Sequence, residues 1–185
     1  RWWQSRLCRF ILVIFLFFVM PRESQALDQV TLQLKWLLQF QFAGYYAALE
    51  KGFYREAGLD VQIREGGPNV DAIEDVVTGR ADFGVGTSGA LIARAHGKEV
   101  VVLAAVFQHS PAILLVPRRA AVSSIFALQD RPLMDTPGSE DIAAMLKLAG
   151  VDYAKMPRVK HNGDPLDLVS GKADAMVAYS TNEPF

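Results

Sequence analysis

The sequence contains a single cysteine, Cys8, and no second long apolar run follows Phe10–Met20. Because Cys8 lies ahead of that run, the rest of the chain has no thiol for a disulfide, a metal site or a nucleophile. The three histidines, His96, His109 and His161, lack metal-like spacing with carboxylates. There is also no Ser/His/Asp order with an elbow turn, and no lysine of a nucleotide P-loop. We therefore expect no catalytic centre, no metal and no cofactor.

Acidic side chains outnumber basic ones beyond the first segment. The first 26 residues contain four Arg and one Glu, so the remaining 159 carry 15 basic and 19 acidic side chains. Because no basic cluster is left, we do not expect nucleic acid as a partner. A length of 159 residues suits one domain or a pair of smaller lobes.

Residues 1–26 have the three-part layout of a secretory signal peptide. Arg1, Arg6 and Arg9 form a basic front, Phe10–Met20 is an apolar run of 11 residues, and Ser24-Gln25-Ala26 offers small residues at a cleavage site. As a helix the run would reach about 16 Å, too short for a bilayer core of roughly 30 Å. We expect export to the periplasm or to the extracytoplasmic face of the inner membrane; the alternative is an uncleaved anchor. Since the chain starts with Arg, we expect this end to be incomplete.

The segment from Val30 to Ile63 predicts a strand, a crossover helix and a second, parallel strand. Val30–Trp36 alternates like a strand, a helix begins near Gly44, and Leu59–Ile63 reads as the next strand. Short apolar strands and amphipathic helices continue to alternate after it, which is typical of an α/β fold with a mostly parallel sheet. The further elements expected are helices Asp71–Thr78 and Ser88–Ala95, with Ser88 as N-cap, and buried strands Val100–Val106 and Ile113–Val116.

A repeat indicates two lobes. The unit Val77–Ser88 reads as helix end, Gly cap, basic residue, Ala-Asp and strand, and Val169–Ser180 repeats this order 92 residues later. We expect lobe 1 at residues 27–117 and lobe 2 at residues 118–185, with a break near Pro117–Ser124. In lobe 2 a strand near Leu133 and a helix from Thr136-Pro137-Gly138-Ser139-Glu140 to Leu148 are expected. Because the sequence stops directly after the second unit, we expect lobe 2 to be incomplete and its C-terminal part to be missing.

Aromatic and amide side chains follow the first strand, where ligands of open α/β sheets bind. Trp36 and Tyr45 are the strongest candidates for stacking on a flat ring, with Phe40 and Gln39 in the loop between them. The alternative is that each ring belongs to the core.

Polar candidates follow the other strands. Gly86, Thr87 and Ser88 join a strand to a helix and suit a carbonyl or anionic oxygen of a ligand, or an ordinary N-cap. Gln108, His109 and Ser110 follow the Val100–Val106 strand and could bond a ring, or lie on the surface. Tyr179 and Glu183 end the second unit, where Glu183 could accept from an exocyclic amine or be a solvated carboxylate.

Most of residues 29–185 resembles the thiamine-pyrimidine-precursor family of type II periplasmic solute-binding proteins. The resemblance implies a Venus-flytrap fold whose two α/β lobes close over a pyrimidine or related heterocycle. It implies an ABC permease as partner or, alternatively, a role as the extracytoplasmic sensing domain of a histidine kinase or diguanylate cyclase. The runs that carry it are Lys35-Trp36, Gly44-Tyr45-Tyr46-Ala47-Ala48, Lys51-Gly52-Phe53-Tyr54, Glu56-Ala57-Gly58-Leu59-Asp60-Val61, Gly79-Arg80-Ala81-Asp82-Phe83-Gly84 and Glu183-Pro184.

The family that this sequence resembles has fungal relatives, which are enzymes that make the thiamine pyrimidine from pyridoxal phosphate and a histidine of their own. Their segment matching Gly86–Ala90 carries a cofactor-binding lysine and that histidine, whereas this chain has Gly-Thr-Ser-Gly-Ala there. Their cysteine cluster is also missing from this sequence. We therefore expect a binding protein rather than a synthase, although sulfonates, riboflavin and other small molecules also occur as ligands in the family.

Overall fold

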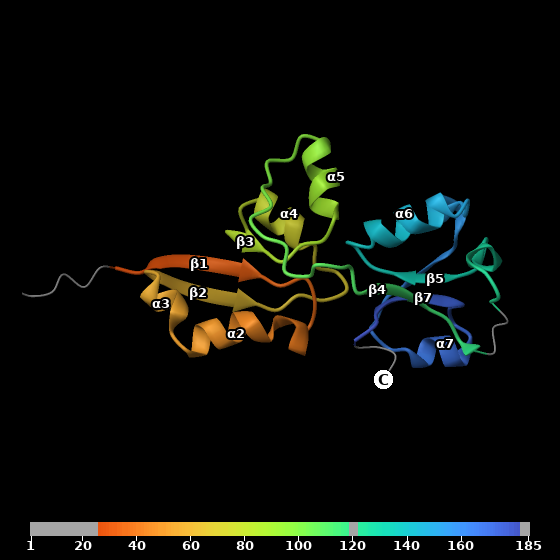
Figure 1. Cartoon of the computed structure of the whole chain (residues 1–185), viewed down its shortest axis with the longest axis horizontal. Helices are drawn as coiled ribbons and strands as arrows, with labels where there is room; N and C mark the ends of the chain where they lie inside the picture. Colours follow the sequence, from red (N-terminus) through yellow and green to blue (C-terminus); the bar gives the residue numbers. More distant parts are fainter. Residues whose placement is uncertain (1–25, 119–121, 182–185) are drawn as a thin grey trace, which may run out of the picture.

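The computed structural model describes residues 26–118 and 122–181, and these form two α/β lobes that lie side by side (Figure 1). The sheet of the first lobe contains β1 (Asp28–Gln33), β2 (Leu59–Arg64) and β3 (Phe83–Gly84). Its order is β2-β1-β3 and every pair is parallel. The crossover predicted between the first two strands is therefore confirmed. The predicted signal peptide lies almost wholly outside the described residues.

Helices cover both faces of this sheet, as the parallel pairing requires. In Figure 1, α2 and α3 lie on one face, and α4 and α5 on the other. Asp71 starts α4 because its carboxylate accepts hydrogen bonds from the backbone N–H groups of Ile73 and Glu74. The bounds of the helical elements are η1 Phe40–Phe42, α2 Ala43–Glu50, α3 Phe53–Glu56, α4 Ala72–Val77 and α5 Gly89–Ala95.

The second lobe holds a four-stranded sheet of order β4-β7-β5-β6. β5 is parallel to β6 and β7, whereas β4 is antiparallel to β7. In the core of this lobe, α6 packs against the sheet, and Leu133 and Leu146 are fully buried between the two. The elements are β4 Ala112–Leu115, η3 Ile125–Leu128, β5 Leu133–Asp135, α6 Glu140–Leu148, η4 Tyr153–Lys155, β6 Arg158–Lys160, α7 Leu166–Ser170 and β7 Ala175–Tyr179.

The two units of the sequence repeat have the same local structure. Gly79 and Gly171 both have positive φ, at 70° and 80°. In the first unit, the backbone N–H of Arg80 donates to the carbonyl of Asp75 and its guanidinium pairs with the Asp75 carboxylate at 2.6 Å. In the second, Lys172 makes the same two contacts with Asp167, the ion pair measuring 2.7 Å. Each unit then enters a strand, so the prediction of paired lobes rests on a real structural repeat.

Two predicted strands need correction. No strand forms over Val100–Val106, where Val101, Val102 and Leu103 are 71%, 61% and 74% exposed. An apolar run becomes a strand only where a ladder partner is present, and the neighbouring β3 extends over just two residues. The apolar run at Ile113 does form a strand, but this strand, β4, pairs with β7 in the second sheet. The chain therefore changes sheet before Ala112, ahead of the boundary predicted at residue 117.

Ser88 stands at the N-cap position of α5, as predicted, but its side chain does not make the capping hydrogen bond. The Ser88 side chain is exposed and caps nothing, whereas the hydroxyl of Thr87 accepts from the backbone N–H of Gly89 at 3.3 Å. Serine and threonine hydroxyls commonly bond the backbone two residues ahead in this way. Thr87 thus takes the role expected of its neighbour.

Candidate functional site

The carboxyl ends of strands from both sheets point at the junction of the two lobes (Figure 1). Loops that follow strand ends of this kind carry the ligand contacts of open α/β sheets. Seven residues from these loops and strand ends make contacts across the junction, and we call them the interlobe seam. They are Lys35, Trp36 and Thr87 of the first lobe and Gly138, Glu140, His161 and Tyr179 of the second.

Trp36 and His161 form an aromatic contact across the seam. Their ring centroids lie 5.3 Å apart with the planes at 90°, an edge-to-face arrangement. Trp36 is half-buried, whereas His161 is 4% exposed. The Nδ1 atom of His161 accepts from the backbone N–H of Gly163 at 3.0 Å, so Nε2 carries the proton and donates to the Val177 carbonyl at 2.8 Å. Two hydrogen bonds thus fix the imidazole against which the indole rests.

The backbone of Trp36 is held by the neighbouring loop. The N–H of Gly66 donates to the Trp36 carbonyl at 3.0 Å. A Cβ at Gly66 would lie 2.3 Å from the carbonyl oxygen of Leu34 and 2.5 Å from the Trp36 nitrogen, so only glycine fits here. The buried Gln33 amide also ties the two loops, since it donates to the carbonyls of Leu34 and Glu65 at 2.9 and 3.0 Å. These contacts set the position from which the indole leaves the strand.

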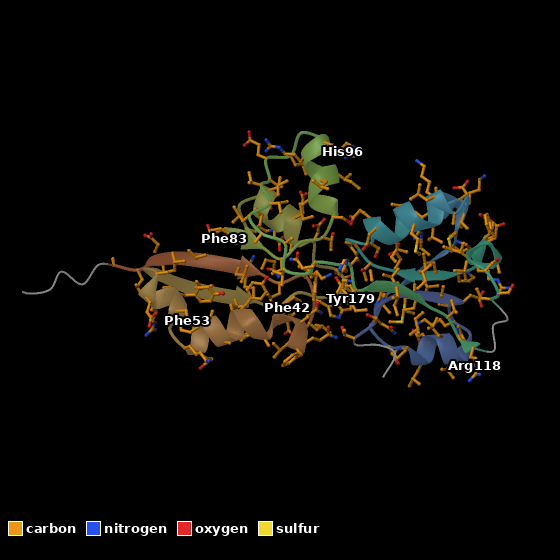
Figure 2. The ribbon with its side chains drawn as sticks, in the orientation of Figure 1. Phe42, Phe53, Phe83, His96, Arg118 and Tyr179 are labelled. Atoms are coloured by element: carbon orange, nitrogen blue, oxygen red, sulfur yellow. The ribbon has the colours of Figure 1, made fainter. Side chains whose placement is uncertain are left out.

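Lys35 and Tyr179 form the second contact of the seam. The ammonium of Lys35 donates to the Tyr179 hydroxyl and lies 4.2 Å from the centroid of its ring. The ring of Phe107 meets Tyr179 edge-on, with centroids 6.4 Å apart. Figure 2 shows Tyr179 where the two lobes meet. This part of the seam combines aromatic faces with one positive charge.

Thr87 and Glu140 form the third contact. The Thr87 hydroxyl donates to the Glu140 carboxylate at 3.1 Å. Gly138, with φ at +91°, approaches Thr87 so closely that a Cβ there would lie 3.3 Å from the Thr87 methyl group. The start of α6 and the loop before it therefore lie against the loop that contains Thr87. This part of the seam carries negative charge.

The structure brings three of the predicted site residues together at the seam: Trp36, Thr87 and Tyr179. Phe40 does not join them, because it is 93% exposed at the start of η1. Tyr45 lies beside Tyr54 of α3, whose pKa is raised by burial and by the nearby Tyr45 phenol. Burial also raises the pKa of Tyr45 itself. The expected pairing of Trp36 with Tyr45 around one ring stays a prediction.

The other predicted residues have separate positions. Gln39 accepts from the Gln41 amide at 2.7 Å, and Gly86 packs on Ile73. Ser110 donates to Asp141 at 2.6 Å, near the point where the chain enters the second lobe. The remaining predicted contacts are Ser88, Gln108 and His109, which are exposed, and Glu183, which lies outside the described residues.

Sequence reasoning missed four members of the seam: Lys35, Gly138, Glu140 and His161 as contact residues. Glu140 and Gly138 were predicted only as the start of a helix. His161 directly follows β6, a strand whose sequence Arg-Val-Lys is too short and too polar for a periodicity argument. Because that strand could not be identified from the sequence, the position of His161 directly after its end gave no usable signal.

Within residues 26–118 and 122–181, no group of three His, Cys, Asp or Glu side chains is placed to hold a metal ion. Within the same residues, no helix has the length and apolar character to span a bilayer.

Comparison with known proteins gives a consistent result. The family model described as "NMT1/THI5 like" matches residues 39–185. The riboflavin-binding protein RibY of Chloroflexus aurantiacus is 26% identical over 175 residues, which cover 89% of this chain and 49% of RibY. Both findings confirm the expected membership among solute-binding proteins.

Solved structures share the fold. A protein from Bordetella bronchiseptica superimposes with a TM-score of 0.70 at 20% identity, over 83% of this chain and 51% of the other. The alkanesulfonate-binding protein SsuA from Xanthomonas axonopodis, bound to MOPS, gives 0.55 at 16% identity, over 83% and 55%. The predicted type II periplasmic-binding-protein fold, with two α/β lobes, is thereby confirmed. The chain spans about half the length of the relatives it matches.

Proposed function

This chain belongs to the NMT1/THI5-like family, and we propose that it is an extracytoplasmic module that captures a small planar heterocycle, similar to the pyrimidine precursor of thiamine, by closing its two lobes. The observation that carries the proposal is the position of Trp36, half-buried at the junction of the lobes and supported by His161. The leader-like sequence of residues 1–26 and the fold shared with SsuA support a location in the periplasm or on the outer face of the inner membrane.

The composition of the seam supports a flat ligand with polar edges. Trp36 and Tyr179 supply aromatic faces, and an offset stack with a heterocycle contributes about 0.5–1.5 kcal/mol beyond area burial. Lys35 offers hydrogen-bond donors beside the Tyr179 ring, and Glu140 offers acceptors beside Thr87. Ligand sites of this kind combine apolar walls with a few polar groups that fix orientation.

Closure is the proposed mechanism. Among the described residues the chain passes between the sheets once, through the segment that ends at Ala112, and this segment is largely exposed and without helix or strand. Hinges are segments of this type, which absorb changes in backbone angle while the lobes stay rigid. A ligand that contacts both lobes binds the closed state more tightly and shifts the population toward it.

The name of RibY supports a heterocycle over an aliphatic ligand, since riboflavin is a flat fused ring. The MOPS-bound SsuA structure shares only the fold at 16% identity, so a sulfonate has weaker support. We propose an ABC permease as the partner of the closed form, with delivery of the heterocycle for thiamine synthesis or salvage. A sensing domain that transmits the same closure to an attached kinase or cyclase is the alternative, and the gene sequence after Phe185 distinguishes the two.

Calorimetric titration with hydroxymethylpyrimidine and with riboflavin tests the proposal. Trp36→Ala should lower the affinity for the bound heterocycle at least tenfold, because the ring loses its stacking surface. Phe53→Ala is the matched control, since Phe53 is an exposed ring on α3 at the far end of the first lobe (Figure 2). If Trp36→Ala binds as tightly as the unchanged protein, Trp36 does not belong to the site.

A further inference from the structure

Glu140 reaches from the second lobe onto the loop of the first lobe that was predicted to bind a ligand oxygen. Its Oε2 atom accepts from the Thr87 hydroxyl at 3.1 Å. The carboxylate lies directly over Gly89, where a Cβ would come within 2.7 Å of Oε1. Gly89 is buried, and its N–H donates to the Thr87 hydroxyl. The space above this loop is therefore filled by a carboxylate.

The carboxylate changes what this loop can bind. The Thr87 hydroxyl accepts from Gly89 and donates its one proton to Glu140, so it has no donor left for a ligand. Glu140 itself presents only acceptors when ionised. A ligand anion placed here would meet a like charge at short range in a half-buried site, where such repulsion is weakly screened. A ligand with N–H donors would find acceptors.

We propose that Glu140 determines specificity: it excludes anionic groups from the Thr87 end of the seam and accepts a hydrogen bond from an amine or ring N–H of the ligand. This inference rests on the proposed function, because it takes the seam as the ligand site. It assigns a direction to the ligand, whose donor-bearing edge lies toward Glu140.

The neighbouring Asp141 provides a matched control. It lies in the same first turn of α6 and carries the same charge, but its carboxylate accepts from Ser110 at 2.6 Å instead of facing Thr87. Asp141→Asn removes one negative charge from this turn and leaves the Thr87 contact in place. Glu140→Gln removes the charge while keeping the size of the side chain.

The experiment compares the unchanged protein, Glu140→Gln and Asp141→Asn by calorimetry with two probes, hydroxymethylpyrimidine and ethanesulfonate. We expect Glu140→Gln to bind ethanesulfonate at least tenfold more tightly than the unchanged protein, and to bind hydroxymethylpyrimidine at least tenfold less tightly. Asp141→Asn should do neither. A gain for ethanesulfonate in Glu140→Gln supports the inference even if no protein binds the pyrimidine, a result that would refute only the proposed heterocycle.

Two outcomes overturn the inference. One is that Glu140→Gln binds hydroxymethylpyrimidine as tightly as the unchanged protein does and gains no affinity for ethanesulfonate. The proposed function then stands without this role for Glu140. The other is an equal gain for ethanesulfonate in both variants, which would indicate a general effect of net charge. Thermal unfolding of each variant establishes that all three proteins are folded before titration.

Discussion

The indole of Trp36 and the imidazole of His161 meet edge to face across the junction of the two lobes, with their ring centroids 5.3 Å apart. The imidazole cannot turn freely, because Val177 and Gly163 occupy both of its nitrogens. The indole therefore rests on a rigid, buried support that belongs to the other lobe. Any change in the angle between the lobes must alter this contact, so Trp36 links lobe position to the surface proposed for the ligand.

His161→Ala should weaken ligand binding about three- to tenfold and lower the free energy of unfolding by about 1–3 kcal/mol. The first effect follows from the lost support of Trp36, and the second from the unpaired Val177 carbonyl and Gly163 N–H. Calorimetry and denaturant unfolding measure the two effects. Trp36 is the sole tryptophan after residue 26, so its emission reports the same site. His96→Ala, at the exposed end of α5 (Figure 2), should show neither change; an equal loss there would contradict the prediction.

Gly66→Ala should reduce ligand affinity at least tenfold. An added methyl group would lie 2.5 Å or less from backbone atoms of Leu34, Lys35 and Trp36, so the segment carrying the seam residues must move. Gly44→Ala is the control, because nothing lies within 4 Å of a Cβ there and alanine is favoured over glycine in a helix. The two affinities are measured by calorimetric titration with hydroxymethylpyrimidine or riboflavin, whichever the unchanged protein binds. Normal affinity in Gly66→Ala would mean that the position of Trp36 is irrelevant to binding.

Local signals in the sequence were enough to predict the repeat but not the seam. The glycines at residues 79 and 171 mark helix ends through their backbone freedom, and the Ala-Asp pairs that follow lead into strands, so both units could be identified without tertiary information. The contact of Thr87 with Glu140 joins residues 53 positions apart. Its formation depends on how two sheets face one another, and no periodicity within either segment contains that information.

The error at residues 100–106 has a related cause. Apolar composition predicts burial, yet a strand forms only where a neighbouring strand offers a ladder, and these residues lie exposed beyond the short β3. The opposite error occurred at β6, where Arg158 and Lys160 hide a strand that pairs with the buried β5. Tertiary partners overrode local preference in both places.

Gly138→Ala should lower ligand affinity more than Gly171→Ala does. Both residues have positive φ, at +91° and +80°, so both substitutions carry a similar backbone strain of about 1 kcal/mol. Only at Gly138 would the methyl group press on another lobe, 3.3 Å from Thr87, whereas nothing lies within 4 Å at Gly171. Unfolding measurements should therefore give similar losses of stability, and titration should separate the two variants. Equal affinities would show that close approach of the lobes at Thr87 is not needed for binding.

Tyr153 should make the second lobe sensitive to alkaline pH. Burial and the hydrogen bond to Asp135 raise the pKa of Tyr153 from 10.0 to about 12. Arg158 holds the same cluster together, since it pairs with Asp135 at 2.6 Å and its guanidinium carbon lies 3.5 Å from the centroid of the Tyr153 ring. Asp135 is the last residue of β5, directly ahead of the loop that contains Gly138. The cluster therefore anchors one side of the seam.

Proton linkage determines the direction in which the free energy of unfolding changes with pH. Between pH 10 and pH 12 the unfolded chain has released the Tyr153 proton while the folded chain keeps it, so unfolding releases a proton and becomes easier as pH rises. The stabilisation is complete below pH 10 and is lost as pH approaches 12. We expect Tyr153→Phe to cost about 1–2 kcal/mol at neutral pH, because a hydrogen bond to a carboxylate is lost. Denaturant unfolding measures the free energy of unfolding of both proteins across this range. The difference between the two values should be constant up to pH 10 and should shrink above it. The other tyrosines cancel in this comparison, so a difference that persists undiminished to pH 12 would contradict the assignment of the raised pKa to Tyr153.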